Sequence, residues 1–310
     1  MAFSARRLVD RPIIFGDMDE RMGRNINGPS HIRSPEWLTS APGTYLLYFA
    51  DHKGTYLRLA YADALEGPWT IHTPGCLDLA QSKFPTQLLP EGKRPAWVEE
   101  APQWYYPHIA SPDVHVDDAA QELRMYFHGM RSNGEQQTRL ARSRDGVTFT
   151  VSDALLGPPY FRVFQHDGFW YAFALPNQLL RSTDGESSFE VGPTPLPQST
   201  RHTAVCVRGD KLDVFWSEIG DAPERIYAGR IDLSGDWHTW TLKNKHEVLR
   251  AELDWEGATE PITASVAGAV DEPVNQLRDP CVFEEAGRLY LLYSASGEAA
   301  IGIAELTETS

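Results

Sequence analysis

The sequence is poor in cysteine, in basic charge and in long apolar runs, and each shortage excludes a class of protein. Three cysteines among 310 residues, odd in number and far apart, favour buried free thiols over a disulfide framework or a metal site. A formal charge of −15 argues against nucleic acid and anionic membrane surfaces as partners, because both attract basic patches. No stretch approaches the roughly 20 apolar residues of a membrane span.

The N-terminus also lacks the features of a secretory signal. Its two adjacent arginines are followed by only a few apolar residues, which Asp10 and Arg11 interrupt. We therefore expect a cytoplasmic protein. The chain has no glycine-rich phosphate loop, no nucleophile elbow and no dinucleotide-binding fingerprint, so the sequence predicts no organic cofactor.

Helical periodicity is missing as well, and alternation with a period of two takes its place. In residues 108–130, Asp113 and His115 alternate with valines, and after a turn Leu123, Met125 and Phe127 alternate with more polar residues. This pattern predicts a pair of β-strands. Similar pairs recur down the chain, joined by turns that contain glycine or aspartate.

Five such units account for most of the sequence. They span approximately residues 27–72, 108–152, 160–192, 201–242 and 277–305, and each has three or four short strands. Repeats of this kind predict an all-β five-bladed β-propeller, with two packed sheet sandwiches as the alternative. The fifth unit lacks room for a fourth strand, so we expect residues 11–15 to supply it and close the ring. Residues 1–310 would then form one domain.

Residues 73–107 interrupt this pattern with prolines and little periodicity. A connection of that length without structure of its own is uncommon inside a compact domain. Its aromatic residues, Trp97 and Trp104 among them, suit a sugar-binding loop. A surface loop packed by its own aromatic side chains is the alternative.

The chain resembles the five-bladed propeller glycosidases, namely glycoside hydrolase family 43 and the related invertase-like and neoagarobiose-hydrolase-like families. The resemblance is carried by Arg278-Asp279-Pro280-Cys281-Val282-Phe283, by Tyr290-Leu291-Leu292-Tyr293-Ser294 and by Ser111-Pro112-Asp113-Val114. It implies a base Asp on the first strand of the first blade, a second Asp that orients or tunes it, and a Glu acid. Here the first-blade position reads Asn27-Gly28-Pro29-Ser30, without an Asp.

Glycoside hydrolysis requires a proton donor and a carboxylate that attacks the sugar or activates water. The first strands of all blades converge on the axis of a propeller, so ionisable residues on them can meet. The predicted catalytic residues are Asp113, His202, Glu218 and Asp279. His202 would be the counterpart of the histidine acid of the neoagarobiose-hydrolase-like branch. Structural roles for these residues, such as an Asp279–Arg278 pair, remain the alternative.

The remaining polar residues near the predicted axis are expected to bind substrate. They are Asn27, His31, His52, His108, His128, Arg162 and Arg278. Several histidines raise a metal site as another interpretation, but no ligand spacing such as His-Glu-x-x-His is present. The resemblance allows for a structural calcium or other ion on the axis.

These observations favour a glycoside hydrolase that cleaves a plant or algal oligosaccharide by acid–base catalysis in a pocket on the propeller axis. A propeller that binds carbohydrate without cleaving it is the alternative, and the missing first-blade Asp favours it. A scaffold that binds protein is a third reading. The sequence specifies neither the sugar nor the oligomeric state.

Overall fold

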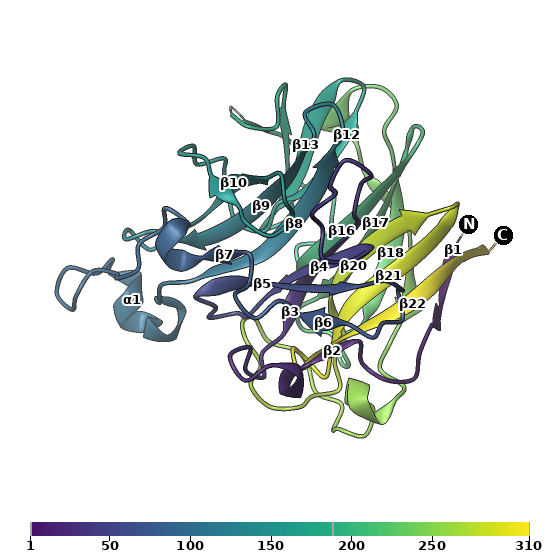
Figure 1. The fold of residues 1–310 in the computed structure, drawn as a ribbon, viewed down its shortest axis with the longest axis horizontal. Coiled ribbons are helices and arrows are strands. Elements are labelled where there is room, and N and C mark those ends of the chain that lie inside the picture. Colours follow the sequence, from purple (N-terminus) through teal and green to yellow (C-terminus); the bar gives the residue numbers. More distant parts are fainter. Residues whose placement is uncertain (1, 188, 310) are drawn as a thin grey trace.

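The computed structural model describes residues 2–187 and 189–309, and these residues form five antiparallel sheets (Figure 1). The first strands of the sheets pack against one another in a ring, which confirms the predicted five-bladed β-propeller. No helix in the described part of the chain is long and apolar enough to cross a membrane.

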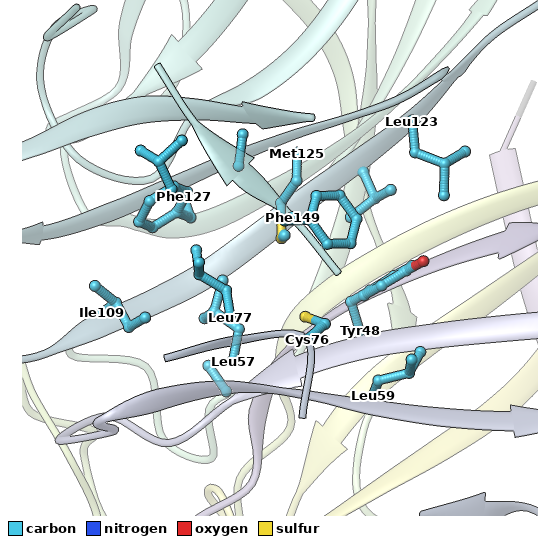
Figure 2. Packing of buried hydrophobic residues seen from close by; sticks show 14 of the residues in the cluster. Tyr48, Leu57, Leu59, Cys76, Leu77, Ile109, Leu123, Met125, Phe127 and Phe149 are labelled. Atoms are coloured by element: carbon cyan, nitrogen blue, oxygen red, sulfur yellow. The ribbon is translucent and has the colours of Figure 1, made fainter. Parts of the chain in front are cut away.

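The first two blades share the largest core cluster. The first blade contains β3 (Asn27–Arg33), β4 (Tyr45–Ala50), β5 (Tyr56–Ala62), β6 (Thr70–Ile71) and β7 (Leu77–Asp78). The second blade contains β8 (Ile109–Asp117), β9 (Glu122–Met130), β10 (Gln136–Ser143) and β11 (Thr150–Val151). Figure 2 shows Tyr48 and Leu57 of the first blade packed against Met125 and Phe127 of the second. Each such side chain contributes about 1.5–3 kcal/mol through burial.

The third and fourth blades follow the same plan. The third contains β12 (Arg162–His166), β13 (Phe169–Ala174), β14 (Gln178–Ser182) and β15 (Glu190–Val191). The fourth contains β16 (Thr200–Arg208), β17 (Lys211–Glu218), β18 (Ile226–Asp232) and β19 (Leu242–Leu249). This blade was predicted to end at residue 242. The segment around Trp237 is a short helix, and the last strand, β19, follows it and continues to Leu249.

The fifth blade contains strands from both ends of the chain. β20 (Arg278–Glu285), β21 (Arg288–Ala295) and β22 (Ala300–Thr309) are completed on the outside by β1 (Ala2–Arg7). Closure by an N-terminal strand was predicted, but from residues 11–15. Of that segment, β2 (Ile14–Phe15) also pairs with β22, whereas β1 forms the outer strand. Phe3 of β1 is buried against Phe215, and this contact anchors the strand.

Four of the five inner strands carry a β-bulge near their N-terminal end. In three blades a proline follows a residue with positive φ at the bulge, namely Gly28 (59°), Ser111 (50°) and Asp279 (46°). Bulges re-aim side chains, and non-glycine residues in this conformation are often found at functional sites. Among the three, only Asp279 is ionisable.

Two long connections meet at the N-terminal ends of the inner strands. The first includes the short helices η2 (Leu79–Gln81), α1 (Trp97–Glu100) and η3 (Pro102–Trp104), and the second includes η5 (Asp254–Glu256). The Trp104 ring lies so close to Gly268 that an added Cβ there would be 2.1 Å from it. The backbone carbonyls of Val266 and Gly268 accept hydrogen bonds from Arg201 and Arg278, which lie at the N-terminal ends of the inner strands β16 and β20. The two loops therefore cover this end of the axis. The short helices η1 (Gly16–Met18) and η4 (Trp237–Thr239) lie elsewhere.

Candidate active site

Polar side chains gather at the end of the axis that the two loops cover. Arg201, His202, Arg278 and Asp279 come from the N-terminal ends of β16 and β20. Other members come from the connections between the second and third strands of the blades: His52, Glu224 and Glu298. The charged side chains therefore gather where the inner strands begin and where the second strand of a blade connects to the third.

A buried network of two guanidinium groups and one carboxylate lies at the centre of this group. One oxygen of Glu224 is 2.8 Å from Nε of Arg201, and the other is 3.0 Å from Nε of Arg278. Ser217 also donates a hydrogen bond to Glu224 at 2.7 Å. All three charged side chains are almost completely inaccessible to solvent. Such charges are tolerated inside a protein only when paired and hydrogen-bonded, so this network fixes their positions.

Glu298 connects this network to His52. Its Oε1 is 3.1 Å from Nη1 of Arg278, and its Oε2 accepts hydrogen bonds from Asn25 at 2.7 Å and from Asn27 at 3.3 Å. Nδ1 of His52 is 3.6 Å from Oε2. Burial would raise the pKa of Glu298, but His52, Arg278 and Asn25 together lower it to about 2. Glu298 is therefore ionised at neutral pH.

His202 and Asp279 form a second histidine–carboxylate pair. Nδ1 of His202 contacts Oδ1 of Asp279. The other carboxylate oxygen of Asp279 accepts hydrogen bonds from the backbone N–H of Gly28 at 3.4 Å and from Ser294 at 3.3 Å. Burial lowers the pKa of His202 well below its usual value, and the charges of neighbouring Arg201 lower it further. The imidazole is thus neutral at neutral pH, and Nδ1 is the ring atom that faces Asp279.

Aromatic rings form a continuous row beside these two pairs. The centroid distances are 4.7 Å from Tyr106 to His108, 5.7 Å from His108 to His128, 4.2 Å from His128 to Tyr160 and 4.3 Å from Tyr160 to His202. Burial lowers the pKa of His108 to about 4 and that of His128 well below its usual value. Burial also raises the pKa of Tyr106 and of Tyr160, so the whole row is uncharged at neutral pH.

A cavity of about 460 Å³ opens onto Glu298 at this end of the axis. Its walls include Asn25, Asp51, Lys53 and Asp271. The volume is within the range of about 300–1,000 Å³ that small-molecule sites occupy. A second hollow beside His202, of about 10 Å³, is far too small for a sugar ring.

Asp113, the other predicted inner-strand carboxylate, lies further along the axis. Nε2 of His115 is 2.8 Å from its Oδ2, and the backbone N–H of Val163 donates to the same oxygen at 2.8 Å. Asp113 and His115 line a different cavity of about 380 Å³, enclosed by all five inner strands. Burial would raise the pKa of Asp113, but His115, Arg162 and Val163 together lower it.

The remaining predicted residues divide between the two regions. Glu218 lies away from both, since its Oε1 is 2.6 Å from Nζ of Lys245 and accepts the indole N–H of Trp216 at 2.9 Å. His31 is packed among Tyr45, Trp69 and Phe283, and burial lowers its pKa to about 3. His31 is 5% exposed and lies in the wall of the same cavity of about 380 Å³ that Asp113 and His115 line.

Arg162 lies between the two regions. Its guanidinium donates to the backbone carbonyls of Phe161 at 3.0 Å and of Ser111 and Pro112 at 3.4 Å. Among residues 2–187 and 189–309, no group of three or more His, Cys, Asp or Glu side chains could hold a metal ion.

Two residues of the cluster, Glu224 and Glu298, were missed in the sequence. Most of the predicted site residues belong to inner strands, whereas both glutamates lie in the connections after the second strand of a blade. His52 occupies the corresponding connection of the first blade and was predicted. Extending that reasoning to all five blades would have found both glutamates.

Comparisons with known proteins agree with this architecture. No protein-family model matches the chain. "Uncharacterized protein R118" of Acanthamoeba polyphaga mimivirus is 35% identical over 310 residues, which cover 91% of this chain and 83% of that protein. This chain belongs to the family of that mimivirus protein. The family is thereby established at the level of sequence, although the mimivirus relative is itself uncharacterized.

Solved structures show that this family has the propeller fold of glycoside hydrolase family 43. CoXyl43, a β-xylosidase/α-arabinofuranosidase from a compost microbial metagenome in complex with xylotriose, matches with a TM-score of 0.61 and 12% identity over 99% of this chain and 96% of its own. A GH43_1 enzyme from Xanthomonas citri, also complexed with xylotriose, matches with a TM-score of 0.61 and 12% identity over 97% and 91%. At these identities the likeness shows the fold.

Proposed function

We propose that this chain is a glycoside hydrolase whose reaction takes place at the loop-covered end of the axis. The proposal is carried by two histidine–carboxylate pairs at this end, His52–Glu298 and His202–Asp279, the first of which meets a cavity of about 460 Å³ through Glu298. The enzymes of similar fold that hold xylotriose support an oligosaccharide substrate. A plant or algal oligosaccharide fits this expectation, with pentose units the first to test.

The two pairs differ in the way that acid–base catalysis requires. In our proposal His52, whose partner Glu298 is ionised, donates a proton to the leaving oxygen. His202 is neutral, and because Asp279 holds its Nδ1, its Nε2 is the atom that accepts a proton from water. His52 lies near enough for its charge to lower the pKa of His202.

A carbohydrate-binding propeller without catalytic activity is the second candidate. It is favoured by the first-blade bulge, where Gly28 occupies the position that Asp279 occupies in the fifth blade. It is also favoured by the complete burial of Asp279. In this case the same cavity would hold the sugar, but no bond would be broken.

The test is turnover of an aryl β-xyloside, an aryl α-arabinofuranoside and a wider panel of aryl glycosides and oligosaccharides. We expect His52→Gln and Asp279→Asn to lower kcat about 10²–10⁴-fold, which is the usual contribution of a general acid or base. Glu218→Gln is the matched control, because this carboxylate is paired with Lys245 away from the cavity. It should leave turnover unchanged.

Two results would contradict the proposal in different ways. Full turnover in both site variants, with Glu218→Gln equally active, would show that the reaction takes place elsewhere in the molecule. Binding of oligosaccharides without any product from the wild-type protein would establish the non-catalytic alternative.

A further inference from the structure

Asn25 lies between the two members of the His52–Glu298 pair and is bonded to both. Its Nδ2 donates a hydrogen bond to Oε2 of Glu298 at 2.7 Å, and its Oδ1 accepts the backbone N–H of His52 at 2.8 Å. Asn25 belongs to the segment before β3, His52 follows β4, and Glu298 lies between β21 and β22. One amide therefore joins three separate segments of the chain at the candidate active site.

The two ends of this amide cannot be exchanged. A carboxylate accepts hydrogen bonds and a backbone N–H donates one, so Nδ2 has to face Glu298 and Oδ1 has to face His52. An ionised aspartate at this position would lack the donor, and an alanine would lack both groups. The position therefore requires a side chain that donates and accepts at once.

The main chain of Asn25 is held in place from two sides. Arg58, whose side chain is 3% exposed, donates to the backbone carbonyl of Asn25 at 2.5 Å and to that of Ala50 at 3.1 Å. The next residue, Ile26, donates its backbone N–H to the carbonyl of Glu298 at 2.5 Å. Such support holds the amide in one position relative to the pair.

This amide controls the distance within the pair. Nδ1 of His52 is 3.6 Å from Oε2 of Glu298, which is too long for a hydrogen bond. Oε2 is held instead by the amides of Asn25 at 2.7 Å and of Asn27 at 3.3 Å. Of these two amides, Asn25 makes the shorter bond and also binds the backbone of His52.

From these contacts we propose that Asn25 is a positioning residue, which holds the imidazole of His52 and the carboxylate of Glu298 at their working separation. The inference rests on the proposed function, in which His52 donates the proton. Without the amide, the carboxylate and the imidazole can move apart. A displacement of about 1 Å can lower a rate about 100-fold.

The charged groups around Glu298 decide how this arrangement responds to pH. Arg278 is 3.1 Å and His52 is 3.6 Å from its carboxylate. The phenols of Tyr106 and Tyr160 also lie near it, and burial raises the pKa of both, so they stay neutral. A carboxylate introduced at position 25 would therefore be the one additional negative charge next to Glu298.

The other charges near Asn25 are paired or lie at the open wall of the cavity. Asp51 is 3.0 Å from Arg58, and Lys53 is 3.9 Å from Asp271. The cavity wall also contains Arg24 and Glu272. In Asn25→Asp, two carboxylates would lie within hydrogen-bond distance, and groups so placed take up one shared proton well above the usual carboxyl pKa. Once protonated, the new carboxyl group can donate to Glu298 as the amide does.

The test compares kcat/KM for an aryl glycoside at pH 5 and pH 8. Asn25→Ala should be about 10–100-fold less active than the wild-type protein at both pH values. Asn25→Asp should show the same loss at pH 8 but recover to within about threefold of wild type at pH 5, because it then regains the donor.

Asn133→Asp is the matched control. Asn133 makes the same two kinds of bond in the exposed turn between β9 and β10, where it donates to Oε2 of Glu135 at 2.8 Å and accepts the backbone N–H of Glu135 at 3.2 Å. This variant should match the wild-type protein at both pH values.

Full activity of Asn25→Ala would overturn the inference, and so would an equal loss in Asn25→Asp at the two pH values, since a purely structural defect does not recover the donor in acid. Urea unfolding separates this inference from the proposed function. Relative to wild type, the unfolding midpoint of Asn25→Asp should be lower at pH 8 than at pH 5. If the wild-type protein cleaves no glycoside, the proposed function fails, whereas an equal midpoint shift at both pH values would show that Asn25 does not hold Glu298.

Discussion

Asp113 accepts a hydrogen bond from the backbone N–H of Val163 at 2.8 Å, across the seam between the second and third blades. The same relationship recurs at two other seams. Ser30 accepts the N–H of Val114 at 2.8 Å, and Asp279 accepts that of Gly28 at 3.4 Å. Polar side chains of inner strands therefore join neighbouring blades near the axis.

Replacing Asp113 tests whether this residue has a structural or a chemical role. Asp113→Ala should lower the free energy of unfolding by about 2 kcal/mol, because the N–H of Val163 loses its acceptor in a largely buried place. Asp113→Asn keeps an acceptor oxygen and should cost less, with turnover retained. Urea unfolding and aryl glycoside assays measure both effects. If Asp113→Asn is stable but inactive, the residue acts in the chemistry.

Glu224 should be one of the most sensitive positions in the protein. Glu224→Gln removes the carboxylate that pairs with both Arg201 and Arg278, and these two guanidinium groups stay buried. Breaking a buried ion pair in this way costs about 3–5 kcal/mol. Glu218→Gln breaks the ion pair with Lys245, whose side chain is 41% exposed, and should cost about 1 kcal/mol or less. Urea denaturation compares the two variants. Equal destabilisation would mean that the buried network is not stabilising.

The pKa of Glu298 predicts how stability depends on pH. Folding lowers this pKa to about 2 from an ordinary value near 4.3. The ionised carboxylate therefore stabilises the fold fully above about pH 4.3, and this contribution disappears as the pH falls towards about 2.

Chemical unfolding of the wild-type protein and Glu298→Gln across this pH range provides the measurement. The difference in unfolding free energy between the two proteins should be largest near neutral pH. It should shrink as the solution becomes acidic. A difference that is constant across the range would show that folding does not shift the pKa of Glu298.

The contact between Gly268 and Trp104 predicts a variant that affects the loop-covered end of the axis. A methyl group at Gly268 would lie 2.1 Å from the Trp104 ring, at a backbone φ of 92°, so Gly268→Ala should displace the ring and separate the two loops. We expect a lower kcat/KM together with a loss of about 1–3 kcal/mol in stability. Gly287→Ala is the matched control, since its φ is 75° but its Cβ would meet nothing within 4 Å. That control should lose only about 1–2 kcal/mol, with full activity.

The architecture was predictable because it repeats. Each blade has the same alternation of apolar and polar residues and the same kind of turn residues. An error in the prediction of one unit can therefore be corrected from the other four. The closing strand was harder to find. β1 presents Phe3 and Ala5 to the core. These two apolar residues, which alternate with Ser4 and Arg6, make too short a pattern to distinguish a strand from a loop.

The candidate site was predictable only in part. His202, Asp279 and Arg278 were found because they lie at the start of inner strands, where any propeller brings residues together. The pairing of His202 with Asp279 and the burial of Glu224 depend on how blades and loops pack, which local patterns do not contain. Spacing alone could not separate Asp113 from this group, because it lies on an inner strand as well.

The outer strand of the fifth blade has a consequence for folding. Ala2–Arg7 pairs with the second half of β22, so the step that completes this blade joins segments that are very far apart in the sequence. Contacts of that kind form slowly. A circular permutant that links the two adjacent termini and opens at the Asp167-Gly168 turn would make that step local, and should refold faster at equal stability.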